Sequence, residues 1–496
     1  MLEGGTDAGL DAPALRRALR LLDGGAQRTV AELLQSVLRG TQGGQIPELP
    51  AAAVIKYCRR IGALCERALE SDAAIASRAM NAWALRKKLL RMSYRFPDEE
   101  LWSAGNRLYQ FAQKNGVLDA ETALAGGGAT SLRRERLAGL MLDMAPHASL
   151  SPVQMECLDL LLRQFSASFI ERDTPAPEAP FYVDLARPQP PQRWLPGLPV
   201  RTTMRFFGPG GCAARIAALA VLAADSSGVQ ALPAWAASSG CTPEAYRQLL
   251  GLLARHWSDK PPQRRERRVA ANSNVFLING FEDVRRAVAA SEAALKIERD
   301  GAPELKGELM RDAKYFDRIR FGSVNPDKTT TGKLLRRQLV QPKQVLEKRE
   351  RGEGRPAPET SLVADQSESG IGIALHGRAP WARVGVLVGY RAPDSLQWEV
   401  AVLRRQVRGV RLSLGLERIR GAAATAKLTP VTGGITACDA MLFAEPLNQI
   451  LVPEGVCAEG DTFKVETETG PFGCRIGRIL EKGPDFLRAE YVKTPA

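Results

Sequence analysis

Two short groups of residues in this 496-residue chain have the types and spacing for nucleotide chemistry. The first is the basic run RRERR at 264–268, which places Arg264 and Arg268 four positions apart. The second is the pattern DxSxxG at 365–370, between two apolar runs. A guanidinium makes paired hydrogen bonds to phosphate oxygens or to the O6/N7 edge of guanine. A carboxylate accepts hydrogen bonds from the N–H groups on the other edge of that base. Together the two groups fit a guanine nucleotide that carries phosphates.

The acidic pattern also has a purely structural reading. Asp and Ser before a glycine favour a tight turn by bonding to their own backbone, and Gly370 and Gly372 permit a sharp turn between strands. A second arginine pair, Arg351 and Arg355, ends only ten positions before Asp365 and leaves no room for an intervening strand. We therefore expect any arginine partner of this turn to come from 264–268.

Two other glycine-containing stretches look like nucleotide motifs. Residues 208–213 (GPGGCA) follow a strand and open a helix, but no second strand ending in an acid follows, so we expect an ordinary turn. Gly332-Lys333 lacks the glycine that a P-loop needs five positions earlier, where Asp327 stands. The surrounding stretch at 325–339 resembles the C-terminal lysine motif of adenylate-forming enzymes. Because no phosphate loop or AMP-binding domain precedes it, we do not expect such an enzyme.

The composition argues against several other kinds of site. The eight cysteines form no CxxC pair and the three histidines form no HExxH, so we expect no metal site and no redox motif. The longest apolar run, Ile216 to Ala224, is far shorter than the ~18 residues of a membrane span. The N-terminus has no basic region followed by an apolar core, so we expect no export signal and a cytoplasmic protein.

The charge is concentrated in one region. The chain carries a formal net charge of +13, and residues 255–355 alone hold 24 Lys or Arg against 15 Asp or Glu. Such an excess favours an anionic partner, such as a nucleotide, a nucleic acid or an acidic protein. A solvated surface with a flexible tether would produce the same composition.

The elements that must position these residues change along the chain. Residues 1–173 show helical periodicity, with a capping box expected at Thr29 and Glu32 and further helix starts at 98 and 151. A mixed connecting region follows at 174–258. The arginine run and a first barrel strand occupy 259–283, and 284–357 is a basic helical and flexible insertion. Short strands at roughly ten-residue spacing then predict a β-barrel at 358–421. A β-rich extension or second small barrel takes 422–496.

Together, RxxxR, DxSxxG and the strands that follow resemble the PilZ domain, the bacterial cyclic di-GMP receptor module. The resemblance covers residues 361–419 well and 263–279 less securely. It implies a six-stranded antiparallel barrel with cyclic di-GMP as a signal rather than a substrate, and no catalytic residue, metal or cofactor. The ligand-binding residues that it implies are Arg264, Arg265, Arg268, Asp365, Ser367 and Gly370. One departure is the 97 positions between Arg268 and Asp365, where the family usually has a few tens.

The fold class is therefore multidomain α + β, with an all-helical N-terminal module, a mixed middle region and a C-terminal antiparallel barrel with additional strands. We expect a non-catalytic cyclic di-GMP receptor that couples ligand binding to a protein partner through its helical N-terminal half. The alternative is an interaction scaffold or nucleic-acid-binding regulator with a degenerate, ligand-free barrel. Aromatic residues are few in the basic region, which weakens the case for a nucleic-acid partner.

Overall fold

The computed structural model divides the chain into two compact units. It describes residues 11–39, 46–68, 72–124, 128–224, 232–258, 260–262, 266–300, 343, 346–347, 358–377, 379–431, 436–444, 446–468 and 470–494. The N-terminal unit comprises Met1–Arg265, Ala379–Val384 and Arg405–Leu412, and the C-terminal unit comprises Glu266–Arg378, Gly385–Arg404 and Ser413–Ala496. The chain thus passes from one unit to the other more than once.

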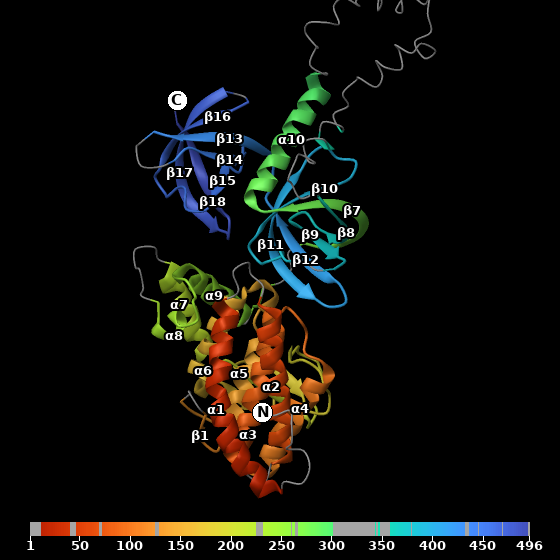
Figure 1. Cartoon of the computed structure of the whole chain (residues 1–496), viewed down its shortest axis with the longest axis vertical. Helices are drawn as coiled ribbons and strands as arrows, with labels where there is room; N and C mark the ends of the chain where they lie inside the picture. Colours follow the sequence, from red (N-terminus) through yellow and green to blue (C-terminus); the bar gives the residue numbers. More distant parts are fainter. Residues whose placement is uncertain are drawn as a thin grey trace, which may run out of the picture. The chain divides into compact units, whose positions relative to one another are not determined.

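Helices make up the first part of the N-terminal unit (Figure 1). They are α1 (Ala12–Arg39), α2 (Glu48–Arg67), α3 (Ala73–Met92), α4 (Glu99–Lys114), α5 (Leu132–Asp143) and α6 (Pro152–Phe165), with a short hairpin of β1 (Thr122–Ala123) and β2 (Ala129–Thr130) before α5. Side chains of Asp72, Asp98, Ser131 and Ser151 cap the N-termini of α3 to α6 by accepting hydrogen bonds from backbone N–H groups. The expected starts at 98 and 151 are confirmed.

The expected capping box at Thr29 and Glu32 is wrong. Both residues lie inside α1, which continues from Ala12 to Arg39. The buried residues Leu15, Leu19 and Val30 follow one face of this helix on both sides of Gly24 and Gly25. The apolar face therefore holds the helix together through the glycine pair, although glycine is a poor helix former.

Paired charges lie within the core of this helical region. Lys87 of α3 is fully buried and forms an ion pair with Asp143 of α5, which also pairs with Arg91 at 2.7 Å. Lys88 pairs with Asp159 of α6 at 2.8 Å. Because an unpaired buried charge is strongly unfavourable, these pairs favour one register of α3 against α5 and α6.

A mixed region completes the N-terminal unit. Its strands β3 (Ile170–Arg172), β4 (Phe181–Asp184), β5 (Gln192–Arg193) and β6 (Met204–Gly208) form an antiparallel sheet in the order β3-β6-β4-β5. The helices α7 (Cys212–Ala224), α8 (Ala234–Ala237) and α9 (Pro243–His256) follow. The expected strand-to-helix turn at 208–213 therefore joins β6 to α7, and α9 begins after its cap Thr242.

The C-terminal unit begins with a closed antiparallel barrel of six strands, here barrel 1. Its strands are β7 (Val269–Asn279), β8 (Glu359–Gln366), β9 (Gly370–Leu375), β10 (Leu387–Arg391), β11 (Glu399–Arg408) and β12 (Leu412–Arg418). They are hydrogen-bonded in the order β10-β11-β12-β9-β8-β7, and β7 closes the barrel by pairing with β10. β7 also pairs with β8, so neighbours in the barrel are far apart in the sequence.

Helix α10 (Phe281–Asp300) follows β7 and packs against both barrels of the C-terminal unit. Ser291 Oγ donates to the carbonyl of Leu396 at 2.8 Å, in barrel 1. Glu292 accepts a hydrogen bond at 2.9 Å from the backbone N–H of Thr425, in the strand that begins the second barrel. The backbone N–H of Phe281 donates to Asp485 at 2.6 Å. Buried residues of α10 and of both barrels form one apolar cluster.

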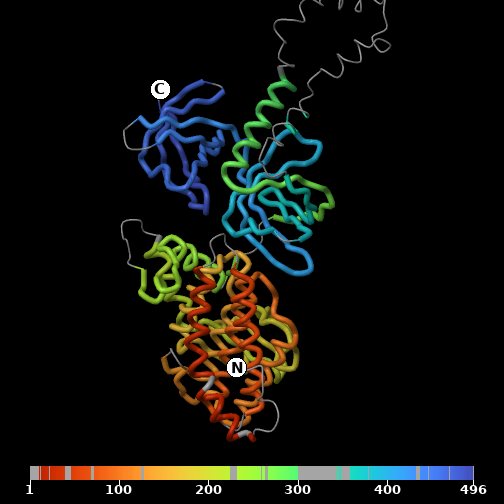
Figure 2. The backbone as a smooth tube through the Cα atoms, viewed as in Figure 1, coloured from red at the N-terminus to blue at the C-terminus, as the bar shows by residue number. Residues whose placement is uncertain are grey.

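Barrel 2 is also closed, antiparallel and six-stranded. Its backbone has the blue colours of the C-terminal end of the chain in Figure 2. It comprises β13 (Ala423–Pro430), β14 (Cys438–Phe443), β15 (Gln449–Pro453), β16 (Thr462–Thr467), β17 (Gly470–Lys482) and β18 (Phe486–Thr494) in the order β13-β14-β15-β18-β17-β16. The helical N-terminal region, mixed middle and antiparallel barrel confirm the predicted fold class. Of the two expected forms for 422–496, the structure shows the second barrel.

Candidate functional site

The DxSxxG pattern forms the connection between β8 and β9. Asp365 lies in β8 opposite Gly372 of β9, and Gly370 is the first residue of β9. The turn is closed by the backbone N–H of Ser367, which donates to the carbonyl of Gly370 at 2.8 Å. The Ser367 hydroxyl points to the same carbonyl, at 3.4 Å. The local turn chemistry expected from the sequence is therefore present.

The structure also brings one arginine of the basic run to this turn. Arg268 directly precedes β7, and Ala270 of that strand lies opposite Asp365 of β8. The Arg268 guanidinium donates a hydrogen bond to the Asp365 carboxylate and forms an ion pair with it. Arg268 and Asp365 are 97 positions apart in the sequence, and the pairing of β7 with β8 brings them into contact in the fold.

Glycine leaves space for neighbouring atoms at two positions of this connection. A Cβ on Gly370 would lie 2.7 Å from the carbonyl oxygen of Leu416 in β12, too close for any other residue. A Cβ on Gly372 would lie 2.9 Å from the carboxyl carbon of Asp365 and 3.2 Å from Arg268 Nη1. The two glycines therefore leave space for the paired Arg268 and Asp365 and for the close approach of β12.

Three residues that the sequence reasoning missed complete the site. Glu266 accepts hydrogen bonds from the backbone N–H and the hydroxyl of Ser369, at 2.8 and 2.7 Å. These hydrogen bonds, first the one from the Ser369 hydroxyl, lower the pKa of Glu266. Arg420 lies 3.8 Å from Glu266 and 3.2 Å from Glu368. Glu266 and Ser369 occupy variable positions of the two motifs, so the motif patterns gave no signal for them.

The remaining predicted ligand residues lie outside the described part of the chain. They are Arg264 and Arg265. The alternative arginine pair Arg351 and Arg355 and the stretch at 325–339 also lie outside it. Among the described residues, no group of His, Cys, Asp or Glu has the arrangement of a metal site, and no helix is long and apolar enough to cross a membrane. All eight cysteines are described and are free thiols.

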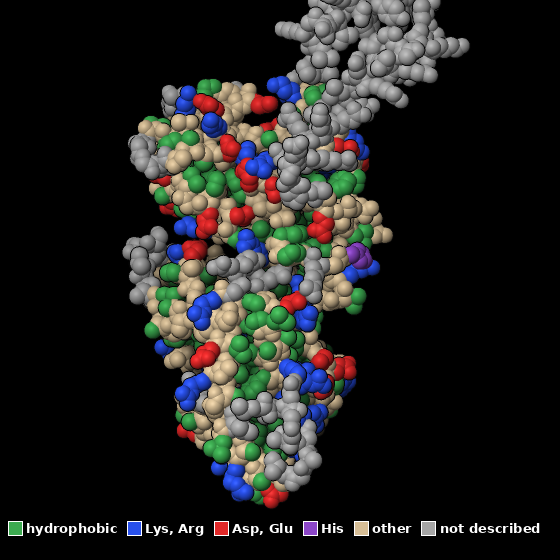
Figure 3. Space-filling model, viewed as in Figure 1, with side chains coloured by type: hydrophobic (Ala, Val, Ile, Leu, Met, Phe, Trp, Pro, Cys, Tyr) green, Lys and Arg blue, Asp and Glu red, His purple; other side chains and the backbone are tan. Residues whose placement is uncertain are grey.

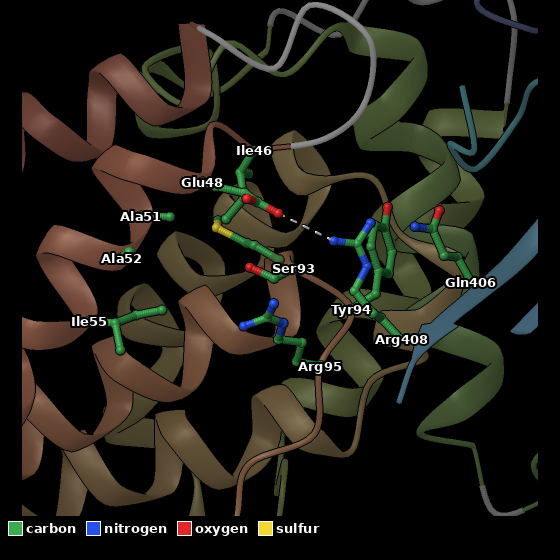
Figure 4. Close-up of a pocket in the computed structure, with 11 residues that line it drawn as sticks. Ile46, Glu48, Ala51, Ala52, Ile55, Ser93, Tyr94, Arg95, Gln406 and Arg408 are labelled. Carbon is green, nitrogen blue, oxygen red and sulfur yellow. Dashed lines mark ion pairs between the residues drawn. The ribbon is translucent and has the colours of Figure 1, made fainter. Parts of the chain in front are cut away.

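A separate pocket lies in the N-terminal unit (Figure 4). Its apolar wall includes Ile46 and Ile55, and its polar side includes Glu48 and Arg408, which form an ion pair at 3.9 Å. Gln406 also lines it and is 1% exposed, and its side-chain amide has no hydrogen-bond partner in the described part of the chain. Among the described residues, none that the sequence assigned to the ligand lines this pocket.

Comparison with known proteins gives a match in the N-terminal part of the chain, away from barrel 1. Residues 6–170 match the family model described as the N-terminal domain of the cyclic-di-GMP receptor FimW. The helical N-terminal region resembles a cyclic-di-GMP receptor domain. This match confirms the expected resemblance to cyclic-di-GMP receptors. It lies in the region of α1 to α6, away from both the RxxxR and the DxSxxG patterns. No curated protein matches the chain.

Proposed function

We propose that this protein is a non-catalytic cyclic di-GMP receptor whose barrel 1 is a PilZ-like ligand-binding domain. The observation that carries the proposal is the pairing of Arg268 with Asp365 beside the glycine-ended turn of a closed six-stranded barrel. The match of residues 6–170 to a receptor family supports the same ligand independently.

The proposed binding residues act by charge and hydrogen bonding. Arg264, Arg265 and Arg268 would hold the phosphates and one guanine edge, while Asp365 and Ser367 would read the N–H edge of guanine. Gly370 allows the turn to lie against β12. Since arginines neutralise the ligand phosphates, the affinity should fall as the salt concentration rises.

The test is a calorimetric titration of the full chain with cyclic di-GMP, with cyclic di-AMP as the matched ligand control. The wild-type chain should bind cyclic di-GMP with a dissociation constant that is micromolar or lower. Both Arg268→Ala and Asp365→Ala should lose this binding. Arg267→Ala is the matched control variant, because Arg267 is exposed and adjacent to Arg268. It removes the same charge and should keep most of the affinity. Absence of heat with either ligand, together with binding to generic RNA or DNA, would instead favour the nucleic-acid-binding regulator.

The helical N-terminal region is the proposed output module, which contacts a protein partner when the barrel is occupied. In this mechanism the ligand engages the arginine segment on barrel 1 and shifts the population of the partner-binding state. Hydrogen exchange on the full chain tests the coupling: cyclic di-GMP should change protection in α1 to α6 as well as at 365–370. Changes confined to the turn would contradict it. The free thiols suit a reducing compartment, and we place the protein in the cytoplasm.

A further inference from the structure

Glu266 occupies the donors of the 365–370 turn in this structure. Its Oε2 accepts from both the backbone N–H and the hydroxyl of Ser369, at 2.8 and 2.7 Å. A carboxylate that accepts from an N–H and an O–H makes the same kind of hydrogen bonds as a phosphate oxygen or the acceptor edge of a guanine would make with these donors. The turn is thus engaged with an anion supplied by the chain itself.

The position of Glu266 in the chain makes this contact relevant to the ligand. Glu266 lies two positions before Arg268, inside the arginine run, and Arg420 lies 3.8 Å from its carboxylate. Negative charge at this point repels a phosphate and satisfies cationic groups that would otherwise attract it. Its side chain remains 27% exposed, so solvent can replace the contact when it opens.

We propose that Glu266 is an internal latch that competes with the nucleotide for the Ser369 donors, so that binding requires its release. This inference rests on the proposed function and adds a regulatory residue to the same site. The latch sets the affinity below what the arginines and the turn alone would give. It also ties the arginine segment to the turn while the ligand is absent, because Glu266 and Arg268 lie two positions apart in the chain.

The direct test compares cyclic di-GMP affinity in three variants with that of the wild-type chain. Glu266→Ala frees the Ser369 donors and should bind roughly three- to tenfold more tightly, the factor expected for a competing hydrogen bond of ordinary net strength. Glu266→Asp keeps the charge but is one methylene shorter, so it should also bind more tightly. Glu368→Ala is the matched control: it removes a carboxylate from the same turn, one that pairs with Arg420 at 3.2 Å. It should change the affinity less than twofold.

Two results would overturn the latch while leaving the proposed function intact. One is that the wild type binds cyclic di-GMP and Glu266→Ala binds it no more tightly. The other is that Glu266→Ala does bind more tightly, but Glu368→Ala shows the same gain or Glu266→Asp shows none. The gain would then come from the change in net charge rather than from loss of the contact with Ser369.

A second readout needs no ligand. The Ser369 amide should exchange with solvent faster in Glu266→Ala than in the wild type and in Glu368→Ala, as measured by NMR. Unchanged exchange would show that the contact is absent in solution and would refute the latch, even if no variant bound cyclic di-GMP. Faster exchange in Glu266→Ala, with no variant binding cyclic di-GMP, would show that the contact between Glu266 and Ser369 exists in solution and would refute the receptor proposal.

Discussion

Replacing Gly372 by alanine should separate the proposed ligand binding of barrel 1 from the stability of the barrel. An added Cβ would lie 2.9 Å from the Asp365 carboxyl carbon, about 0.5 Å inside the 3.4 Å at which ordinary contact begins, and nearer still to Asp365 Oδ1. The backbone of Gly372 is outside the left-handed region, so alanine adds no backbone strain. The Asp365 side chain must therefore turn away, and Arg268 loses its partner.

The exposure of the two side chains and the nature of the clash predict that Gly372→Ala lowers the stability of the barrel only slightly and the affinity for cyclic di-GMP more strongly. The side chains of Arg268 and Asp365 are 27% and 36% exposed, so the loss of their ion pair costs about 1 kcal/mol or less. The clash falls on the end of a side chain rather than on backbone, which keeps the overpacking cost near the lower end of about 1–3 kcal/mol. The melting temperature should fall by only a few degrees. Loss of a hydrogen-bonded carboxylate should weaken cyclic di-GMP binding by about 10- to 100-fold.

The assay is a double-mutant cycle on Gly372→Ala and Asp365→Ala, with thermal unfolding and calorimetric titration of each variant. If the clash is with Asp365, Gly372→Ala should add little further destabilisation once Asp365 is truncated. Gly370→Ala is the contrasting variant, because its Cβ meets the backbone of Leu416 and should destabilise the barrel more. An equal cost of Gly372→Ala in both backgrounds, or unchanged ligand affinity, would refute this reasoning.

Three further predictions concern the N-terminal unit. Lys87→Ala should lower the free energy of unfolding by about 3 kcal/mol in a urea titration, because Asp143 loses a buried cationic partner. Lys88→Arg keeps a cation beside Asp159 and should lower the free energy of unfolding by less. Burial, and next the charge of Arg91, lower the pKa of His147 from 6.5 to about 4. The unfolded chain then binds more protons between these values, so stability should fall as the pH drops from 6.5 towards 4. Melting curves recorded across this pH range should show that His147→Asn loses less stability than the wild type, by up to about 3 kcal/mol in total. An unchanged pH dependence of stability would contradict the assignment. Gly24→Ala should stabilise the chain by about 0.5–1 kcal/mol, because alanine is the better helix former and the added Cβ in α1 meets no atom of a described residue within 4 Å. A lower melting temperature would argue that the helix is interrupted at this glycine pair.

The strand-rich character of residues 358–496 could be predicted because apolar and polar residues alternate within individual strands. β12 is an example: Leu412, Leu414 and Leu416 are buried and alternate with more exposed residues. Closure of barrel 2 could not be predicted in this way. β13 reads AATAKLTP, with little β-branched or aromatic content, and it is a strand because it pairs with both β14 and β16.

The candidate site shows the same division. The DxSxxG turn is local, so residue types at fixed spacing were sufficient to place Asp365, Ser367 and Gly370 on one connection. The contact of Arg268 with Asp365 depends on β7 pairing with β8, which no local pattern specifies. Glu266 was missed for a different reason: between arginines it looks like a solvated spacer, and only the fold places Ser369 within its reach.

The pairing of β7 with β8 also has a consequence for how the chain reaches this structure. Roughly 80 residues separate the end of β7 from the start of β8, so this hairpin-like pair closes a loop far longer than that of an ordinary hairpin. For a flexible loop, closure would cost about 2–3 kcal/mol more than for a five-residue turn. During synthesis β7 emerges well before its partner, with both of its edges unpaired, because β10 is later still. Barrel 1 should therefore form late and slowly, and docking of α10 should shorten the effective loop before the strands pair.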